Sequence, residues 1–291
     1  MSKVNLFWMR RDLRLEDNHA LFNALSAGLP VRILFIFDSD ILNRLEAKED
    51  TRVTFIIKRL EELNHLLKKY ASSIHIFHGK VEAVFEQLLS QWAVHTLFFN
   101  KDYEPYTRTR DQKVVALCHA RGIQAISSKD HVLFEEHEIL KKDHTPYTVY
   151  TPYSRQWKAA YQLLSLPSYP SELLLHRLDT SSSPLAQNLH AQIGFRASQR
   201  VAPPTELPDP ELLLQYEKRR DFPAEEGTSR LGTTLRFGLI SIRQLLLHAA
   251  KYSETFLGEL IWREFFIQIL FHFPHVENEA FKPAYSAIPW R

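Results

Sequence analysis

The first 130 residues alternate short apolar runs with amphipathic stretches, and this alternation restricts the possible folds more than any other feature. The apolar runs lie at 4–9, 31–37, 74–77, 96–100 and 124–127. Amphipathic stretches with helical spacing lie between them, at 18–25, 52–70, 81–92 and 108–121. Because strands and helices are expected to alternate, we predict an α/β fold with a parallel sheet.

Several polar side chains follow the apolar runs. Sheets of this kind bind ligands at the carboxyl ends of their strands. The residues at these positions are Arg10, Asp38, His78 and Asp102. We therefore expect them to lie along a ligand-binding edge of the sheet.

The second half of the chain has a different pattern. Periodicity fades from about Phe134, and residues 164–210 are rich in Ser, Pro, Leu and Gln. An irregular connection of this length is unusual inside one compact domain. Helical spacing returns at 209–218, 241–248 and 255–273. We predict three parts, which are an α/β domain at 1–130, an interdomain connection at 131–207 and the start of a helical domain at 208–291.

The composition excludes several classes of protein. The formal net charge of +2 gives no overall attraction to nucleic acid, so basic residues would have to gather on one face. The single cysteine, Cys118, excludes an internal disulfide and a metal site built from several thiolates. No apolar run is long enough to span a membrane. We expect a monomeric, cytoplasmic protein without a metal ion.

Two hydroxyl side chains and an arginine precede a predicted helix in the segment EGTSRLG, residues 226–232. Backbone N–H groups at a helix start, hydroxyl donors and a guanidinium together suit a phosphate or another anion. The same pattern also fits an ordinary helix cap beside a solvated arginine.

A second unusual segment is GELIWREFF, residues 258–266, within an otherwise apolar helix. Its spacing of i, i+3, i+4 and i+7 puts four side chains on one face, namely Glu259, Trp262, Arg263 and Phe266. Charged groups in such a setting need partners when they are buried. The stripe either faces a ligand or contains a Glu259–Arg263 ion pair beside a core tryptophan.

Five segments, in this order, resemble the photolyase and cryptochrome flavoproteins. They are WMRRDLRLEDNHAL at 8–21, NKDYEPYTRTRD at 100–111, YTVYTPYSRQW at 147–157, FPAEEGTSRLGTTLRFG at 222–238 and ELIWREFF at 259–266. The resemblance implies a Rossmann-like α/β antenna domain, a long connection and an all-α domain that holds FAD.

The resemblance also implies roles for the two unusual segments. The residues expected to hold FAD are Tyr216, Thr228, Ser229, Arg230, Leu231, Gly232 and Arg263. Glu259 and Trp262 would be catalytic and would face a pyrimidine dimer flipped out of UV-damaged DNA, as photolyases do. A carboxylate accepts imide N–H bonds and an indole offers a π-face. Arg263 and Phe266 would also contact the DNA.

The reaction implied is light-driven repair, in which reduced FAD gives an electron to the dimer after absorbing blue light. Glu259 favours the cyclobutane enzymes, because the (6-4) enzymes and many cryptochromes carry Gln there. A cryptochrome photoreceptor without repair activity and an inactive fragment are the alternatives. Trp290 matches the outermost tryptophan of the family's electron-transfer chain, or is a packed or exposed residue near the chain end.

A second, light-collecting chromophore is implied by the segment at 100–105. Together with Arg52, the acidic residues Asp102 and Glu104 resemble members that bind a deazaflavin or a flavin. Folate-binding members carry Asn-Glu where this chain has Tyr106 and Thr107, which disfavours folate. Asp102 and Glu104 would otherwise only cap a loop. By the same resemblance, three residues near the amino terminus stabilise the domain, namely Asp12, Arg14 and Asp17.

Members of the family continue beyond the position that Arg291 matches, and part of the flavin pocket lies there. We therefore interpret the chain as a carboxy-terminally truncated class I cyclobutane dimer photolyase. We expect the isolated chain to bind little or no FAD. An exposed apolar face on the helix at 255–273 is expected for the same reason.

Overall fold

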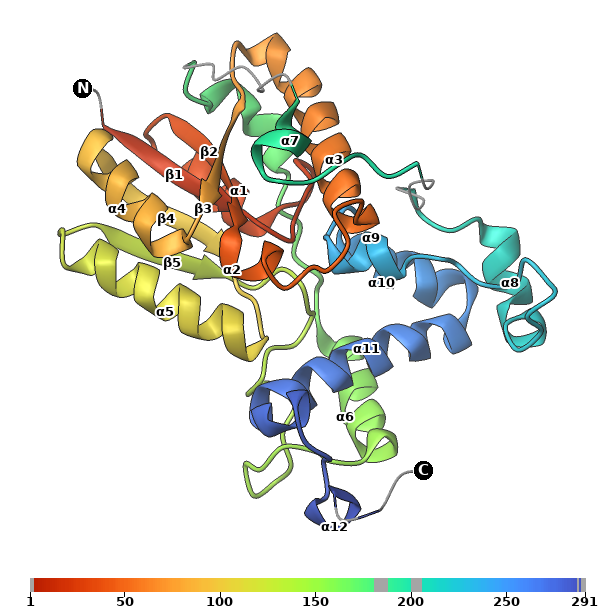
Figure 1. Cartoon of the computed structure of the whole chain (residues 1–291). Coiled ribbons are helices and arrows are strands. Elements are labelled where there is room, and N and C mark those ends of the chain that lie inside the picture. The colour runs from red at the N-terminus through yellow and green to blue at the C-terminus, as the bar shows by residue number, and fades with distance from the viewer. Residues whose placement is uncertain (1–2, 181–187, 200–205, 287, 289–291) are drawn as a thin grey trace.

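A parallel sheet forms the amino-terminal half of the computed structural model, which describes residues 3–180, 188–199, 206–286 and 288. The strands are β1 (Val4–Met9), β2 (Val31–Asp38), β3 (Ile74–Gly79), β4 (Val94–Asn100) and β5 (Gln124–Ser128). Each pairs in parallel with its neighbour in the order β3-β2-β1-β4-β5. The predicted α/β fold with a parallel sheet is confirmed (Figure 1).

Helices cover both faces of the sheet, so its central strand is buried along its whole length. On one face Phe7 and Met9 pack with α1 (His19–Ser26) and α3 (Thr51–Leu67). On the other, Leu6 and Trp8 pack with α4 (Val81–Gln91) and α5 (Pro105–His119). Alternate side chains of a strand point to opposite faces, which explains why β1 is apolar without interruption. The short α2 (Ser39–Leu42) and a 3-10 turn, η1 (Lys68–Tyr70), complete this half.

The strand order changes direction between β1 and β4. From β1 the chain moves outward to β2 and β3, and it then returns to the other side of β1 with β4 and β5. Loops leaving the carboxyl ends of β1 and β4 therefore diverge, and a crevice opens between them.

The connection between the halves contains a helix that the sequence pattern did not reveal. α6 (Tyr150–Leu163) buries Tyr153 and Trp157, and its other positions are mostly polar or exposed. A periodic search for aliphatic residues misses such a helix, because its buried face is aromatic. The connection also includes η2 (Ser171–Arg177) and α7 (Leu189–Gln192).

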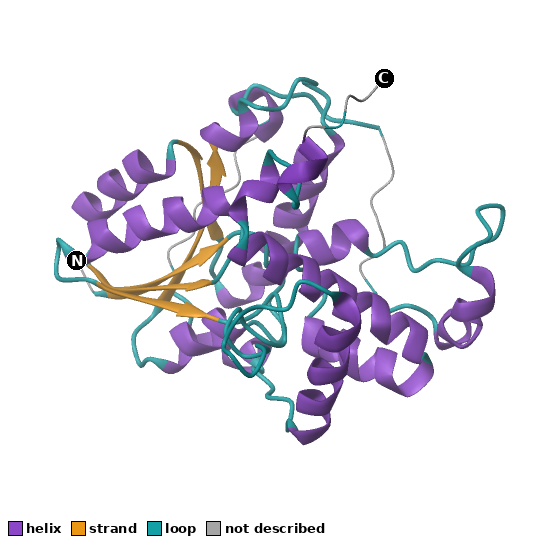
Figure 2. Ribbon diagram, turned by 90° about the horizontal axis from the view of Figure 1, so that it is seen from below, coloured by secondary structure: helices purple, strands orange, loops and turns teal. Residues whose placement is uncertain are grey.

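Only helices and loops follow in the described residues beyond 206. They are α8 (Pro210–Arg219), α9 (Gly232–Arg236), α10 (Ile242–Tyr252), α11 (Glu254–His272), η3 (Pro274–Glu277) and α12 (Pro283–Ser286). α11 crosses this half (Figure 1) and contacts α6, α8 and α10. Figure 2 shows from a second direction that helices and loops surround the strands. Within the described part of the chain, no helix is both long and apolar enough to cross a membrane.

A buried ion network joins the two halves. Arg14, after β1, donates to Asp130 at 2.7 Å, and Arg243 of α10 donates to Asp130 at 3.0 Å and to Asp17 at 2.8 Å. None of these four residues is more than 5% exposed. Burial alone would favour the neutral form of Asp130, but Arg14 and Arg243 outweigh it and hold the pKa of this carboxyl well below its usual range.

The backbone on either side of this network is in direct contact. Leu13 donates its N–H to the carbonyl of Phe237 at 3.0 Å. Gly238 has φ +61°, and a Cβ added there would lie 2.3 Å from the carbonyl oxygen of Arg11. Only glycine therefore allows the segment after α9 to lie this close to the loop after β1.

We predict that Asp130→Asn lowers the free energy of unfolding by about 3 kcal/mol, because two buried guanidiniums lose their shared carboxylate. In the unaltered chain the stability from Asp130 is present above about pH 4 and is lost as the pH falls further, since its folded pKa is depressed. Urea unfolding at several pH values measures both effects. Glu49→Gln, at an exposed ion pair, is the control and should change little; an equal loss in both variants would contradict the prediction.

Candidate functional site

Two cavities lie at the carboxyl edge of the sheet, on opposite sides of a shared wall. Their volumes are about 720 Å³ and about 330 Å³. The residues that line both are Arg11, Asp102, Glu104, Gly232 and Arg236. Arg11 pairs with Asp102 at 3.2 Å and with Glu104 at 2.9 Å, and Arg236 also pairs with Glu104. The wall is therefore made largely of ion pairs that join the loops after β1 and β4 to α9.

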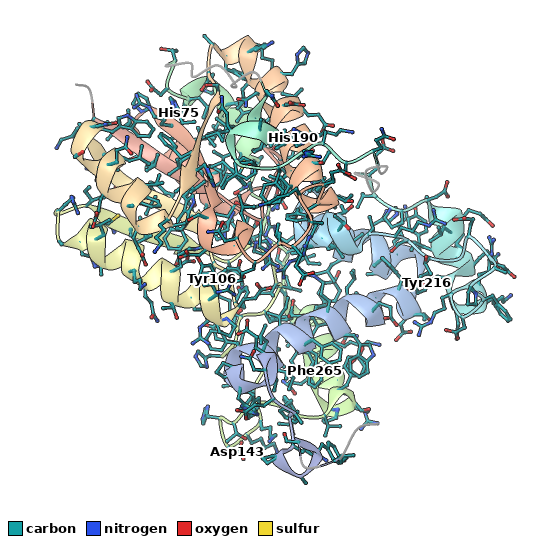
Figure 3. The ribbon with its side chains drawn as sticks, in the orientation of Figure 1. His75, Tyr106, Asp143, His190, Tyr216 and Phe265 are labelled. Atoms are coloured by element: carbon teal, nitrogen blue, oxygen red, sulfur yellow. The ribbon has the colours of Figure 1, made fainter. Side chains whose placement is uncertain are left out.

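The larger cavity contains the three residues predicted to hold a second chromophore. Arg52, Asp102 and Glu104 all line it, with aromatic side chains from β1 and β2. Tyr106, near the start of α5 (Figure 3), donates to Asp38 at 2.7 Å in the same lining. Burial and the bond to Asp38 raise the pKa of Tyr106, so its hydroxyl stays protonated.

Three of the four residues expected along the sheet edge, Arg10, Asp38 and Asp102, line this cavity. His78 does not, and its side chain is exposed. The reason is the strand order: β3 is an edge strand, and two strands separate it from β4.

The smaller cavity lies between the sheet edge and α11. Arg263 lines it and donates to the carbonyl of His131 at 2.8 Å. Among the described residues, no carboxylate lies within ion-pair distance of Arg263. Burial lowers the pKa of Arg263 to about 10, and the cations Arg11 and Arg236 add to this effect. Burial also lowers the pKa of His131 to about 3. At neutral pH the cavity thus contains the half-buried guanidinium of Arg263 beside a neutral imidazole.

The segment EGTSRLG leads into α9 at this cavity. Leu231 is 2% exposed and anchors the segment in the helical core. Thr228 is exposed, Ser229 is half-buried, and the hydroxyls of both have no partner among the described residues. Arg230 has φ +53° and pairs with Glu226 at the surface. The segment therefore has free donors for an anion, whereas its arginine points away from the core.

The predicted cofactor residues thus fit a phosphate-bearing group, but they are not gathered at one point. Gly232 and Arg263 line the smaller cavity, and the hydroxyls of Thr228 and Ser229 belong to the same segment as Gly232. Tyr216 lies farther off on α8, packed edge-on against Phe256 (Figure 3).

The stripe on α11 is divided between two directions. Glu259 pairs with Arg220 at the end of α8 instead of with Arg263. Trp262 is half-buried and Phe266 is 60% exposed on the same side of the helix, whereas Arg263 turns into the smaller cavity. Neighbouring residues of a helix point about 100° apart, which accounts for the separation of Trp262 and Arg263.

Glu264 is the most consequential residue that sequence reasoning missed. Its carboxylate accepts N–H bonds from Leu133 at 2.6 Å, Phe134 at 3.1 Å and the indole of Trp157 at 2.6 Å. It thereby fixes α11 to α6 and to the start of the connection. Burial raises the pKa of Glu264 to about 7, although these three donors lower it. The sequence did contain a sign of its importance, because Glu264 is a second carboxylate, after Glu259, within an otherwise apolar helix.

Residues 5–171 match the family model described as DNA photolyase. The chain belongs to the DNA photolyase family. Residues 256–291, which include most of α11, match the model described as the FAD binding domain of DNA photolyase. The expected membership of the family is therefore confirmed.

Comparison with individual members of the family shows what share of their length this chain matches. A deoxyribodipyrimidine photo-lyase of Synechococcus is 30% identical over 316 residues, which cover all of this chain and 65% of the relative. Cryptochrome-2 of Gallus gallus is 26% identical over 321 residues, covering 98% of this chain and 54% of the relative. The chain thus spans less than two thirds of the length of these relatives.

Among solved structures, a photolyase from Sulfolobus tokodaii with two FAD molecules has a TM-score of 0.71 to this chain. It is 28% identical, and the match covers all of this chain and 64% of that photolyase. The α/β half followed by helices is the architecture that these photolyase-family proteins share with the chain.

We predict that the pKa of Glu264 gives a measurable pH dependence to the stability of the chain. The folded state keeps the proton of Glu264 up to about pH 7, whereas the unfolded chain loses it near the ordinary value of 4.5. Rising pH therefore favours unfolding, and the stability of the unaltered chain relative to Glu264→Gln should fall by roughly 2–3 kcal/mol between pH 5 and 8. Urea unfolding measures the difference.

Glu254→Gln is the matched control, since Glu254 lies on the same helix with its side chain 80% exposed. Its stability relative to the unaltered chain should not vary over this pH range. A constant difference for Glu264→Gln between pH 5 and 8 would contradict the prediction.

Proposed function

We propose that this chain provides the lesion-facing helix and the cofactor-binding segment of a photolyase that splits cyclobutane pyrimidine dimers in UV-damaged DNA, using light. The observation that carries the proposal is the placement of Glu259 and Trp262 together on the partly exposed side of α11. Arg263, one residue further on, lines the smaller cavity instead. One helix thus separates a side suited to bases from a side suited to a phosphate-bearing cofactor.

FAD is the cofactor proposed for the second side. The free hydroxyls of Thr228 and Ser229 and the unpaired guanidinium of Arg263 supply the donors and the charge that phosphates require. When bound in its reduced form, the cofactor supplies electron donation after absorption of blue light. The residues of the chain bind and orient the cofactor, and the apolar side chains of α11 exclude water.

The roles proposed for Glu259 and Trp262 follow from their surroundings. Arg220 forms an ion pair with the Glu259 carboxylate, and the oxygens of that carboxylate can also accept imide N–H bonds. Trp262 has one ring face against Tyr150, so a flipped pyrimidine would use its remaining surface, beside the exposed ring of Phe266. The carboxylate at position 259 is the reason to propose the cyclobutane dimer as the lesion.

A second chromophore is proposed for the larger cavity. Its volume of about 720 Å³ lies in the usual range for sites that bind a small molecule. Aromatic walls from β1 and β2 suit a planar ring system, and Arg52, Asp102 and Glu104 offer polar contacts at its edge. A deazaflavin or a flavin fits this lining better than folate, for which Tyr106 and Thr107 are the wrong pair.

The test uses the full-length photolyase to which this chain would contribute, with FAD, photoreduced, and an oligonucleotide that contains one thymine dimer. Blue light should restore intact thymines, measured by absorbance at 260 nm and by chromatography. Binding to dimer-containing DNA that is no tighter than binding to undamaged DNA would favour a cryptochrome photoreceptor. If the full-length protein restored no intact thymines, the proposal would fail, and a purified chain that bound neither FAD nor DNA would by itself be an inactive module.

Replacing Trp262 with alanine should lower the affinity for dimer-containing DNA about tenfold, because stacking of a base on an aromatic side chain contributes roughly 1–3 kcal/mol. Fluorescence anisotropy with labelled duplexes measures the change. The control is Trp92→Ala, at the end of α4, which should leave the affinity unaltered. An equal loss on undamaged DNA would show that Trp262 does not recognise the lesion.

Filling the larger cavity should prevent a flavin from binding there, whether or not FAD binds at the other site. Ile56 of α3 lines the cavity, and Ile56→Trp places an indole inside it. Quenching of flavin fluorescence should show a stoichiometry lower by one. Leu66→Trp, on the same helix at a position 49% exposed, should retain the full stoichiometry. An unchanged stoichiometry in Ile56→Trp would place any second flavin elsewhere.

A further inference from the structure

The helix α6 presents an aromatic face to the functional helix α11. Its contributing residues stand at i, i+3 and i+7, so they share one side of the helix. The contacts join Tyr150 with Trp262, Tyr153 with Phe265, and Trp157 with Glu264. The segment YTVYTPYSRQW, which the proposed function leaves without a role, therefore supports consecutive turns of α11.

Tyr150 makes the closest of the ring contacts in this group. Its ring lies parallel to the indole of Trp262, with centroids 3.5 Å apart and an angle of 7° between the planes. Its hydroxyl donates to the carbonyl of Gly258 at 2.9 Å. The ring of Tyr150 is thus attached to α11 at two points, one on its face and one at its tip.

The orientation of Trp262 depends on such contacts, because its indole N–H has no hydrogen-bond partner among the described residues. Phe265, which is 4% exposed, meets Trp262 edge-on at 5.7 Å and Tyr150 edge-on at 5.9 Å. Phe266 lies at 5.4 Å with its plane inclined by 23°, but it is 60% exposed and offers a weaker constraint. Stacked and edge-on aromatic pairs contribute roughly 0.5–1.5 kcal/mol each.

We propose that Tyr150 is a positioning residue, which holds the Trp262 indole in a single orientation beside Glu259 for contact with a flipped pyrimidine. The inference rests on the proposed function of Trp262 as the lesion-facing ring. Tyr150 covers one face of the indole, and a base would use the surface that Tyr150 leaves, beside the exposed ring of Phe266. A free indole would instead lose rotamer freedom at the moment of binding, which costs affinity.

The first experiment tests positioning without DNA or cofactor. The chain contains five tryptophans, and labelling them with 5-fluorotryptophan gives fluorine NMR lines; the variant Trp262→Phe identifies the line of residue 262. Tyr150→Leu should shift and broaden this line, because the ring current and the constraint are lost together. Tyr150→Phe keeps the ring and should leave the line sharp and near its original position.

The matched control is Tyr161→Leu on the same helix. Tyr161 stacks on Trp157 with centroids 5.2 Å apart, so this variant should move the line of Trp157 and leave that of Trp262 in place. Urea unfolding checks that each variant is folded. If Tyr150→Leu left the Trp262 line unchanged, the positioning role would be overturned.

The second experiment measures affinity for DNA with and without a thymine dimer. Tyr150→Leu should weaken binding to dimer-containing DNA about fivefold and leave binding to undamaged DNA unchanged, while Tyr150→Phe restores the affinity. If Trp262→Ala weakens binding but Tyr150→Leu does not, positioning by Tyr150 is overturned. If Trp262→Ala has no effect, the proposed function fails, whereas the NMR result still decides whether Tyr150 orients the indole.

Discussion

The carboxylate of Asp130, shared by Arg14 and Arg243, is the interaction on which the arrangement of the two halves depends. Arg14 follows the first strand, Asp130 follows the last, and Arg243 belongs to a helix more than one hundred residues later. Removing any one of them leaves an uncompensated charge in a buried environment. The network therefore fixes the loops after the strands relative to the helical half, and both cavities form along that contact.

The sequence pattern was sufficient for the regular parts of the fold and insufficient for the contacts between them. The strand expected at 4–9 forms over those residues, because an uninterrupted apolar run buried on both faces has few alternatives. The helix from Tyr150 to Leu163 was not predicted, since Tyr and Trp alone mark its buried face. Helical spacing also suggested one stripe for Trp262 and Arg263. In the structure Trp262 stacks on Tyr150, whereas Arg263 donates to the carbonyl of His131, so the two side chains point in different directions.

In the candidate site, too, the sequence did not predict contacts between distant segments. Resemblance to known motifs selected Arg52, Asp102 and Glu104, which the fold brings to one cavity. It passed over Glu264 and Tyr150, whose importance comes from partners far away in the chain. Such residues act through the groups they hold in place, and a pattern within one segment carries no information about the segment that will be packed against it.

The wall between the two cavities has a thermodynamic consequence. Ligands that occupied both cavities would lie against the same five residues, and each would perturb the ion pairs that Glu104 makes with Arg11 and Arg236. Their binding free energies are then not independent. By linkage, each ligand changes the affinity of the other by the same factor, whichever arrives first. The wall of ion pairs thus both separates the two cavities and couples ligand binding in one to ligand binding in the other.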